Sequence, residues 1–301
     1  MTEHPEWVAV DWGTSNLRVW VMGPSGDVLQ YREDPRGMGV LKPEAFAGVL
    51  GELLSGVERQ DTALPVVICG MAGAREGWAE AGYCAVPGPP PGADQSIRVP
   101  ATSPDLKVFI LPGMCQQEPP DVMRGEETQA AGFLAMTPDF DGVLCMPGTH
   151  CKWVRCAEGT VKSFKTTMTG EVFSLLRDHS VLHQALAGPA WDMASFDQAA
   201  ETAAENPGQA LTNLFSIRAD RLLNAAQTGP AQLSGMLIGA EVAALHELWS
   251  RRPVALIGSE QLADLYARVL TARGAEVQRI DAEAVTLRGL KAAYEQLRNR
   301  L

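Results

Sequence analysis

Long apolar runs, basic segments and an excess of positive charge are all missing from this sequence of 301 residues. No stretch approaches the roughly 20 uninterrupted apolar residues that a membrane-spanning helix needs. The first residues, MTEHPEW, contain no basic or apolar signal segment. The formal net charge of −11 disfavours binding to nucleic acid or to an anionic membrane surface. We therefore expect a cytoplasmic protein that binds neither nucleic acid nor membranes.

Cysteine is scarce and irregularly placed. The six cysteines form no CxxC pair, and most of them lie in apolar surroundings. This pattern predicts buried thiols in a reducing compartment. Cys145, Cys151 and Cys156 come close to His150 in the sequence, but strand-like alternation would scatter their side chains over two faces. The spacing therefore argues against a zinc site.

Several catalytic signatures are also missing. The chain contains no G-x-x-x-x-G-K-[ST] pattern, which excludes a P-loop nucleotide site. It has neither H-R-D nor D-F-G, so it is not a protein kinase. A G-x-S-x-G elbow and an H-E-x-x-H helix are absent, which removes the support for hydrolase and zinc-protease chemistry.

What the sequence does contain is a regular alternation of strand-like and helix-like apolar patterns. Residues 84–105, which are rich in Pro and Gly, are expected to form loops or short irregular strands. We expect strands at 7–12, 17–22, 27–32, 65–71, 106–114, 142–156 (strand, turn, strand), 160–168, 253–260 and 276–281. We expect helices at 43–59, 123–136, 171–187, 196–228, 234–249, 261–274 and 282–301.

The order of these elements repeats along the chain. A β-β-β-α-β order in the first part is followed, after a helix, by a second β-β-β unit and further alternating helices and strands. The polar, proline-rich segment 116–123 is the expected hinge between the halves. The sequence therefore predicts an α/β protein with one plan used twice, in domains 1–116 and 117–301. Such an arrangement places a ligand site at the carboxyl ends of the strands.

Two glycine turns occupy matching places in the two halves. Asp11 and the turn Gly13-Thr14-Ser15-Asn16 follow the first strand, and Pro-Gly-Thr-His-Cys-Lys at 147–152 follows a later one. Glycine lets the backbone approach an anion closely, and each turn has a hydroxyl beside it. The pair could cradle the phosphates of ATP, with Asp11 holding Mg²⁺ through water. A single turn of this kind would be read as an ordinary polar hairpin, but the matched pair favours phosphate binding.

The motifs resemble those of known protein families. DWGTSNLR, PGTHCKW and LIGSEQLADLY are similar, in order, to the two phosphate segments and the adenosine segment of the actin-like ATPase superfamily. More narrowly, GMAG…GW, MRGEETQ, MPGTHCKWV, TGE and LIGAE resemble the 2-dehydro-3-deoxygalactonokinase family. The likeness runs from Val8 to about Lys291, and MRGEETQ followed by MPGTHCKWV is its most specific part.

The resemblance implies a fold and a reaction. The fold is two actin-like (ribonuclease H-like) α/β domains flanking an ATP-binding cleft. Residues 1–116 then form the sugar-acid side, and 117–301 form the ATP-binding side with its C-terminal helix. The reaction is ATP-dependent phosphorylation of 2-dehydro-3-deoxy-D-galactonate on its 6-hydroxyl, with ATP and Mg²⁺ as cofactors.

The same resemblance implies an ATP site. Lys152 could reach the γ-phosphate, or lie on the outer face of its strand as a surface charge. Gly258 and Ser259 would let the adenine ring approach the backbone, and Ser259 could equally cap the following helix. The implied ATP-binding residues are Gly13, Thr14, Asn16, Gly148, Thr149, Lys152, Gly258 and Ser259.

The general base is expected at the start of the 123–136 helix. MRGEETQAAGF resembles the Gly-Asp-Gln-Gln-Ala-Ala helix start of sugar kinases related to glycerol kinase, in which the Asp is the base. Aligning the Gln-Ala-Ala segment favours Glu127, and aligning Gly125 places Glu126 there instead. Both depart from the pattern by using Glu. Either carboxylate could also simply complement the positive N-terminus of the helix.

Substrate residues are expected in GMAGAREGW, after the strand at 65–71. Related sugar kinases carry an Arg-Glu pair there, which implies that Arg75 forks onto the substrate carboxylate and Glu76 accepts sugar hydroxyls. A solvated surface pair is an equally good interpretation. Arg124 is a second carboxylate candidate, and Trp78 either walls the pocket or belongs to the core.

Two other functions fit the same sequence. One is a kinase for another sugar or sugar acid of the superfamily, and the other is a non-catalytic ATP-dependent sugar sensor. The partner expected in each case is a small molecule. The sequence leaves the oligomeric state open, with a homodimer as one expectation.

Overall fold

The computed structural model describes residues 4–58, 63–99, 103–187, 191–298 and 300. Its internal contacts divide the chain into two compact units, each formed from more than one stretch of sequence. Unit 1 comprises 1–140, 157–163 and 281–301, and unit 2 comprises 141–156 and 164–280.

Unit 1 is built on a six-stranded sheet in the order β3-β2-β1-β4-β7-β6. Its first strand, β1, is antiparallel to β2 and parallel to β4. A smaller sheet has the order β5-β8-β9. The strands are β1 (Trp7–Trp12), β2 (Leu17–Met22), β3 (Val28–Asp34), β4 (Leu64–Gly70), β5 (Tyr83–Ala85), β6 (Ile97–Val99), β7 (Leu106–Ile110), β8 (Gly113–Gln116) and β9 (Asp121–Met123).

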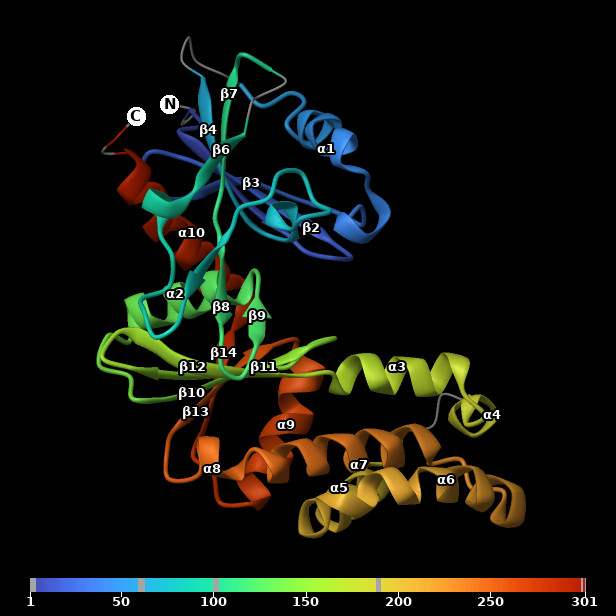
Figure 1. Cartoon of the computed structure of the whole chain (residues 1–301). Coiled ribbons are helices and arrows are strands. Elements are labelled where there is room, and N and C mark those ends of the chain that lie inside the picture. Colours follow the sequence, from blue (N-terminus) through green and yellow to red (C-terminus); the bar gives the residue numbers. More distant parts are fainter. Residues whose placement is uncertain (1–3, 59–62, 100–102, 188–190, 299, 301) are drawn as a thin grey trace. The chain divides into compact units, whose positions relative to one another are not determined.

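Helices cover both faces of the larger sheet (Figure 1). Successive side chains of a strand point to opposite faces. Val8 and Val10 of β1 therefore pack with Phe46 of helix α1 (Phe46–Leu53). Trp7 and Ala9 pack instead with helix α10 (Ala282–Arg298). Asp11 lies in register with these two residues, so its side chain is on the face that α10 covers.

Helix α2 (Glu126–Met136) packs against α10 at two glycines (Figure 1). A Cβ on Gly132 would lie 1.9 Å from the carbonyl oxygen of Val285, and one on Gly289 would lie 2.1 Å from that of Thr128. Only glycine permits so close an approach of two backbones. This contact places α2 and the C-terminal helix in unit 1, whereas the expected boundary between residues 116 and 117 put both helices in the second domain. The expected hinge at 116–123 instead contributes to the β8–β9 pair.

Unit 2 is built on a five-stranded sheet in the order β12-β11-β10-β13-β14. Here β10 is antiparallel to β11 and parallel to β13. This arrangement repeats that of β1 with β2 and β4, so the expected α/β plan used twice is confirmed. The strands are β10 (Gly142–Met146), β11 (Cys151–Ala157), β12 (Thr160–Thr167), β13 (Val254–Gly258) and β14 (Val277–Asp281). The last residues of β11 and β14 and the first half of β12 are counted with unit 1.

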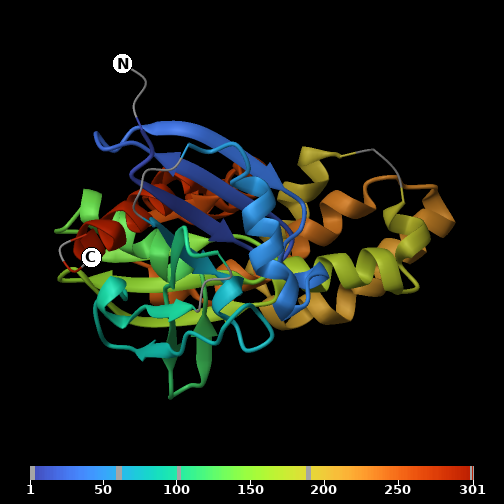
Figure 2. The same ribbon diagram turned by 90° about the horizontal axis from the view of Figure 1, so that it is seen from above.

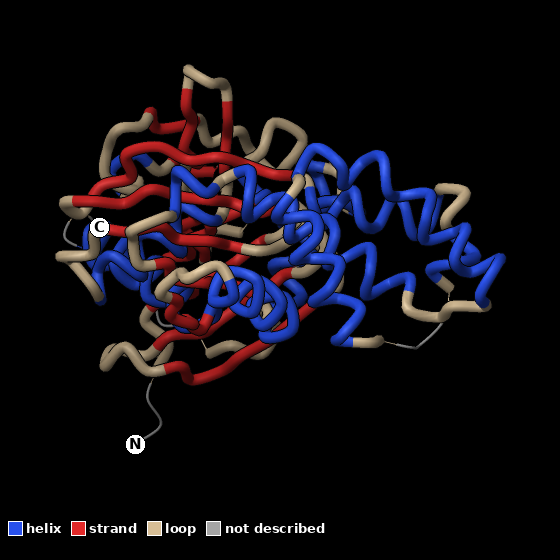
Figure 3. The backbone as a smooth tube through the Cα atoms, turned by 90° about the horizontal axis from the view of Figure 1, so that it is seen from below, coloured by secondary structure: helices blue, strands red, loops and turns tan. Residues whose placement is uncertain are grey.

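Seven helices among the described residues belong to unit 2, and five of them, α3 to α7, gather beside one another (Figures 2 and 3). Alanine and glycine let α5 and α7 approach closely, because a Cβ on Gly239 would lie 2.2 Å from the carbonyl oxygen of Ala200. The helices are α3 (Thr169–His179), α4 (His183–Leu186), α5 (Met193–Glu205), α6 (Ala210–Asn224), α7 (Gly229–Ala244), α8 (His246–Trp249) and α9 (Glu260–Ala272).

The expected elements are present with shifted boundaries. The expected helices at 171–187, 196–228 and 234–249 are each divided in two, and the expected strand at 106–114 is divided between β7 and β8, which belong to different sheets. Short strands occur within 84–105, as expected. Residues 59, 100–102, 299 and 301 of the expected elements lie outside the described residues. Within the described chain, no helix is both long and apolar enough to span a membrane.

Candidate active site

Asp11 lies near the carboxyl end of β1, between two neighbouring strands. In the ladder it is opposite Arg18 of β2 and Cys69 of β4. Its Oδ2 is 3.7 Å from Nη1 of Arg18, and its Oδ1 accepts a hydrogen bond from the Cys69 thiol at 3.8 Å. The side chain remains 22% exposed. Burial raises the pKa of the Asp11 carboxyl, and Arg18 and the Cys69 thiol oppose that rise.

Two glycines bring the start of α2 against this strand end. Gly70, the last residue of β4, has a φ of 88°, and a Cβ there would lie 2.6 Å from the carbonyl oxygen of Trp12. A Cβ on Gly125, which has a φ of 111°, would lie 3.5 Å from the Cα of Gly70. Both positive φ values are costly for any other residue. The two glycines therefore let the β1 and β4 ends and the α2 start converge.

Glu127 is the buried carboxylate of this cluster, with 1% of its surface exposed. Both of its oxygens accept the backbone N–H of Gly125, each at 2.8 Å. Burial and the neighbouring Glu126 raise the pKa of Glu127 to about 8, although the Gly125 hydrogen bond and Arg124 oppose the rise. A carboxylate with a pKa near neutrality is suited to proton transfer.

Glu126 and Arg124 have different surroundings. Glu126 accepts the backbone N–H of Arg124 at 3.1 Å. Arg124 is buried, and its two Nη atoms donate to the carbonyl oxygens of Ala81 and Gly82, each at 3.0 Å. Its guanidinium also lies 4.3 Å from the centre of the Tyr83 ring. Arg124 thus ties the start of α2 to the segment before β5, which makes it a weaker candidate for the substrate carboxylate.

The first glycine turn is held by the segment that follows β3. Met38 donates to the carbonyl oxygen of Gly13 at 3.0 Å, and Gly39 donates to that of Thr14 at 2.8 Å. Gly37 is required there, because a Cβ would lie 2.3 Å from the carbonyl oxygen of Thr14. The Thr14 and Asn16 side chains are exposed. The backbone of the turn is therefore fixed while its polar side chains face outward.

The expected substrate residues follow β4 in a loop. Arg75 and Glu76 are exposed, which leaves both side chains accessible to a ligand. Trp78 is only partly buried, and its ring centre lies 6.1 Å from that of Trp12 and 6.2 Å from that of Phe46. Trp78 therefore packs on the core of unit 1, in agreement with its interpretation as a core residue.

In unit 2 the second glycine turn lies between β10 and β11. Glu171 of α3 donates its backbone N–H to the carbonyl oxygen of Thr149 at 2.9 Å, and its carboxylate lies 2.6 Å from Nε2 of His150. Gly258 lies beside the turn, because a Cβ on it would be 3.2 Å from the carbonyl oxygen of Pro147. Two segments of the expected ATP site, 147–152 and 258–259, are thus adjacent within this unit.

Lys152 and Ser259 are the remaining residues of these two segments expected to bind ATP. Lys152 is 6% exposed, so its interpretation as a surface charge is wrong. Ser259 occupies the N-cap position of α9 and has an extended backbone. Its hydroxyl, however, makes no capping hydrogen bond. The capping position is therefore confirmed, and the hydroxyl is left for another partner.

The structure adds residues to which the sequence pointed only weakly. Arg18 and Cys69 contact Asp11 across the ladder, yet nothing in their local pattern distinguishes them from strand residues. Glu241 lies at the end of the LIGAE motif, and its buried carboxylate accepts the indole N–H of Trp153 at 2.6 Å. Cys69 and Glu241 are distant in sequence from these partners, so only the fold reveals the contacts, whereas Arg18 faces Asp11 across the β1–β2 hairpin.

Among the described residues, no three His, Cys, Asp or Glu side chains form a group that could hold a metal ion. Magnesium, however, is usually held by one or two carboxylates, with water and substrate phosphates as its other ligands. The single, partly exposed carboxylate of Asp11 fits that requirement.

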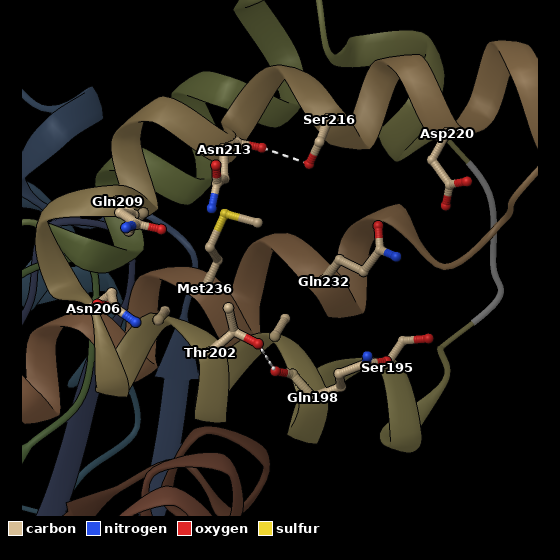
Figure 4. A pocket seen from close by; sticks show the side chains of 13 residues that line it. Ser195, Gln198, Thr202, Asn206, Gln209, Asn213, Ser216, Asp220, Gln232 and Met236 are labelled. Carbon is tan, nitrogen blue, oxygen red and sulfur yellow. Dashed lines mark hydrogen bonds between the residues drawn. The ribbon is translucent and has the colours of Figure 1, made fainter.

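A cavity of about 440 Å³ lies elsewhere in unit 2, between α5, α6 and α7. Figure 4 shows Gln232 and Met236 of α7 directed into the space between α5 and α6. Its polar lining consists mostly of amides and hydroxyls, with Asp220 as its one carboxylate. None of the expected site residues lines it, so this cavity is separate from the candidate chemistry.

The comparisons with known proteins agree with the motifs. A sequence model of the 2-keto-3-deoxy-galactonokinase family matches residues 11–293. The Rhizobium meliloti (strain 1021) protein named probable 2-dehydro-3-deoxygalactonokinase DgoK1 is 42% identical, over 97% of this chain and 98% of that protein. The 2-dehydro-3-deoxygalactonokinase of Escherichia coli (strain K12) is 32% identical, over 97% of this chain and 99% of that protein.

Solved structures confirm the fold. A crystal structure from Sinorhizobium meliloti, described as the same kinase, has a TM-score of 0.90 at 40% identity and covers 97% of this chain and 99% of that one. A dehydratase activator from Clostridium difficile with bound ADPNP has a TM-score of 0.52 at 12% identity, covering 98% and 96%. These likenesses support the expected actin-like α/β fold. The chain belongs to the 2-keto-3-deoxy-galactonokinase family.

Proposed function

We propose that this chain transfers the γ-phosphoryl group of ATP to the 6-hydroxyl of 2-dehydro-3-deoxy-D-galactonate. Membership of the kinase family supplies the reaction class. The observation that carries the assignment to this site is the buried Glu127, whose raised pKa suits a general base, beside Asp11 at the convergence of β1, β4 and α2. Phosphoryl transfer needs alignment, charge neutralisation and a group that takes the hydroxyl proton, more than it needs covalent chemistry.

Each residue has a definite part in the proposal. Glu127 accepts the proton of the 6-hydroxyl as that oxygen attacks phosphorus, and Gly125 holds its carboxylate in place. Asp11 would hold Mg²⁺, and the bound ion would neutralise charge on the transferring phosphates. Lys152 and the turn at Gly148 and Thr149 bind phosphate, while the backbone at Gly258 and Ser259 receives adenosine.

A non-catalytic sugar sensor is the second function that the motifs allowed. A sensor would bind ATP and the sugar acid without consuming either one. Incubating the protein with ATP, Mg²⁺ and the sugar acid, and following both ADP and a phosphate ester, separates the two functions. We expect equal amounts of ADP and phosphorylated acid. Binding of both ligands without any phosphate ester would support the sensor.

Arg75 is the proposed contact for the substrate carboxylate, since Arg124 already donates to two backbone carbonyls. We expect Arg75→Ala to raise KM for the sugar acid by about ten- to a hundredfold, because charge-assisted hydrogen bonds are lost. KM for ATP should stay within about twofold. Steady-state kinetics with each substrate varied in turn gives both values.

Arg98→Ala is a matched control, because Arg98 is also an exposed arginine of unit 1 but lies on β6. It should change neither KM. If Arg75→Ala behaves like this control, the carboxylate is held elsewhere, and Arg124 becomes the next candidate.

We also propose a cytoplasmic location, which the six free cysteines support, since four of them are buried as reduced thiols.

A homodimer is proposed through α6. Leu211, Phe215 and Leu222 are exposed there, and their spacing places them on one face of the helix. We expect Phe215→Glu to convert a dimer to a monomer in sedimentation velocity, and Asn224→Lys, on the opposite side of the same helix, to leave it a dimer. A monomeric parent protein would contradict the proposal.

A further inference from the structure

Two family motifs that the proposed reaction leaves without a role meet in unit 2. TGE occupies 169–171 at the start of α3, and LIGAE occupies 237–241 within α7. The hydroxyl of Thr169 donates a hydrogen bond to Oε2 of Glu241, although the two residues are 72 positions apart. This contact joins the first residue of α3 to a buried acid.

Glu241 is unusual because its carboxylate is buried among neutral donors. Only 7% of the residue is exposed. Its Oε1 accepts the indole N–H of Trp153 at 2.6 Å, and its Oε2 accepts the hydroxyl of Tyr266 at 2.8 Å as well as that of Thr169. A buried carboxylate is costly unless hydrogen bonds replace its lost water. The three donors come from β11, α9 and α3, so Glu241 holds three elements together.

The start of α3 also fixes the second glycine turn. A Cβ on Gly170 would lie 2.3 Å from the carbonyl oxygen of Gly148, so the two backbones touch. Glu171 donates its backbone N–H to the carbonyl oxygen of Thr149 at 2.9 Å. The residues next to Thr169 therefore contact both glycine-turn residues proposed to bind phosphate, and Thr169 itself is held by Glu241.

The strand that leaves the turn is tied to the same acid. Trp153 lies two residues beyond Cys151, and a strand alternates its side chains, so both point to the same face. The Cys151 thiol also interacts with Glu241. The turn at 147–150 is consequently bounded by two segments, β11 and the start of α3, that share one carboxylate.

We propose that Glu241 is a positioning residue for nucleotide binding: through Thr169 and Trp153 it fixes the backbone at Gly148 and Thr149 in the shape that receives the phosphates of ATP. The inference rests on the proposed function, in which this turn binds phosphate. It deepens that function by naming the group that sets the geometry of the turn. Glu241 itself touches neither substrate.

Thr169→Val tests the link, because valine keeps the size and branching of threonine but cannot donate. The start of α3 loses its tether, and the turn becomes free to relax. We expect KM for ATP to rise about tenfold while KM for the sugar acid stays within about twofold. Glu241→Gln should have the same selective effect, since an amide presents N–H groups to at least one of the donors. Thr169→Ser, which keeps the hydroxyl, should leave KM for ATP at the parent value.

Tyr266→Phe is the matched control. It removes a donor from the same carboxylate, but Tyr266 belongs to α9 and to neither of the two segments, β11 and the start of α3, that bound the turn. It should lower Tm as much as Thr169→Val does, yet leave KM for ATP within about twofold. If Thr169→Val and Tyr266→Phe lower Tm equally and neither changes KM for ATP, Glu241 has only a structural role and the inference is overturned.

Gly148→Asp separates this inference from the function on which it rests. The site has room for a side chain, because the nearest atom to a Cβ there is 3.8 Å away, and the added charge would repel phosphate. If Gly148→Asp weakens binding of a non-hydrolysable ATP analogue in calorimetry and Thr169→Val does not, only the inference fails. If neither variant weakens binding, the turn does not receive phosphate and the proposed site is wrong.

Discussion

Glu127→Gln is expected to lower kcat by about a hundred- to ten-thousandfold, the usual cost of losing a general base. The amide keeps the shape of the side chain but cannot accept the proton of the sugar hydroxyl. Because Glu127 is proposed to act on the sugar hydroxyl and is not among the residues proposed to bind ATP, nucleotide affinity should be nearly intact. Single-turnover kinetics together with calorimetric ATP binding measures both quantities.

Glu126→Gln is the control for this experiment, since it changes the neighbouring carboxylate of the same helix start. Successive helix residues point about 100° apart, so the two side chains cannot be placed equivalently toward a substrate. We expect a much smaller effect from Glu126→Gln. The opposite ranking would move the base to Glu126, and small effects from both would leave only their role at the helix N-terminus.

The raised pKa of Glu127 also predicts a pH dependence. A base with a pKa of about 8 is largely protonated below that pH, so kcat/KM should fall as the pH is lowered through 8. Because the folded state holds this proton more tightly than the unfolded state, stability should decrease as the pH rises from the ordinary carboxyl value toward 8. Glu127→Gln should lose both dependences, which pH-rate profiles and urea unfolding would show.

Asp11→Asn has the second large effect that we expect. The change removes a charge from the end of β1 while preserving the size of the side chain. In the proposed site the carboxylate would hold Mg²⁺, so turnover should fall by orders of magnitude in folded protein when it is removed. The Mg²⁺ concentration that gives half-maximal rate should also rise.

Asp27→Asn offers a control in the same unit, because Asp27 is an exposed acid in the turn between β2 and β3, at the opposite end of β2 from the first glycine turn. It should leave kcat and the Mg²⁺ dependence close to those of the parent protein. Near-normal turnover in folded Asp11→Asn would remove Asp11 from the active site.

Much of the fold follows from local pattern, because β1, β2 and their counterparts β10 and β11 are apolar strands joined by conspicuous glycine turns. The domain boundaries do not follow from pattern. They depend on the contact of Gly132 with α10, which joins segments about 150 residues apart through backbone rather than through any periodic signal.

Local sequence likewise predicts some residues of the candidate site and not others. Asp11 and the pair at 126–127 stand out as carboxylates next to apolar strands and a helix start. Local sequence cannot rank Glu127 above Glu126, since burial depends on what packs over the helix. The roles of Arg124 and Glu241 depend on partners such as Ala81 and Thr169, which only the folded chain brings near.

The most direct test of the central claim is kcat/KM across a panel of 2-keto-3-deoxy sugar acids, with the product of the best substrate analysed by phosphorus NMR. The account predicts the highest kcat/KM for 2-dehydro-3-deoxy-D-galactonate and a phosphate coupled to the protons on C6. A higher value for another acid, a phosphate on another carbon, or no ATP-dependent turnover with any member of the panel would contradict it.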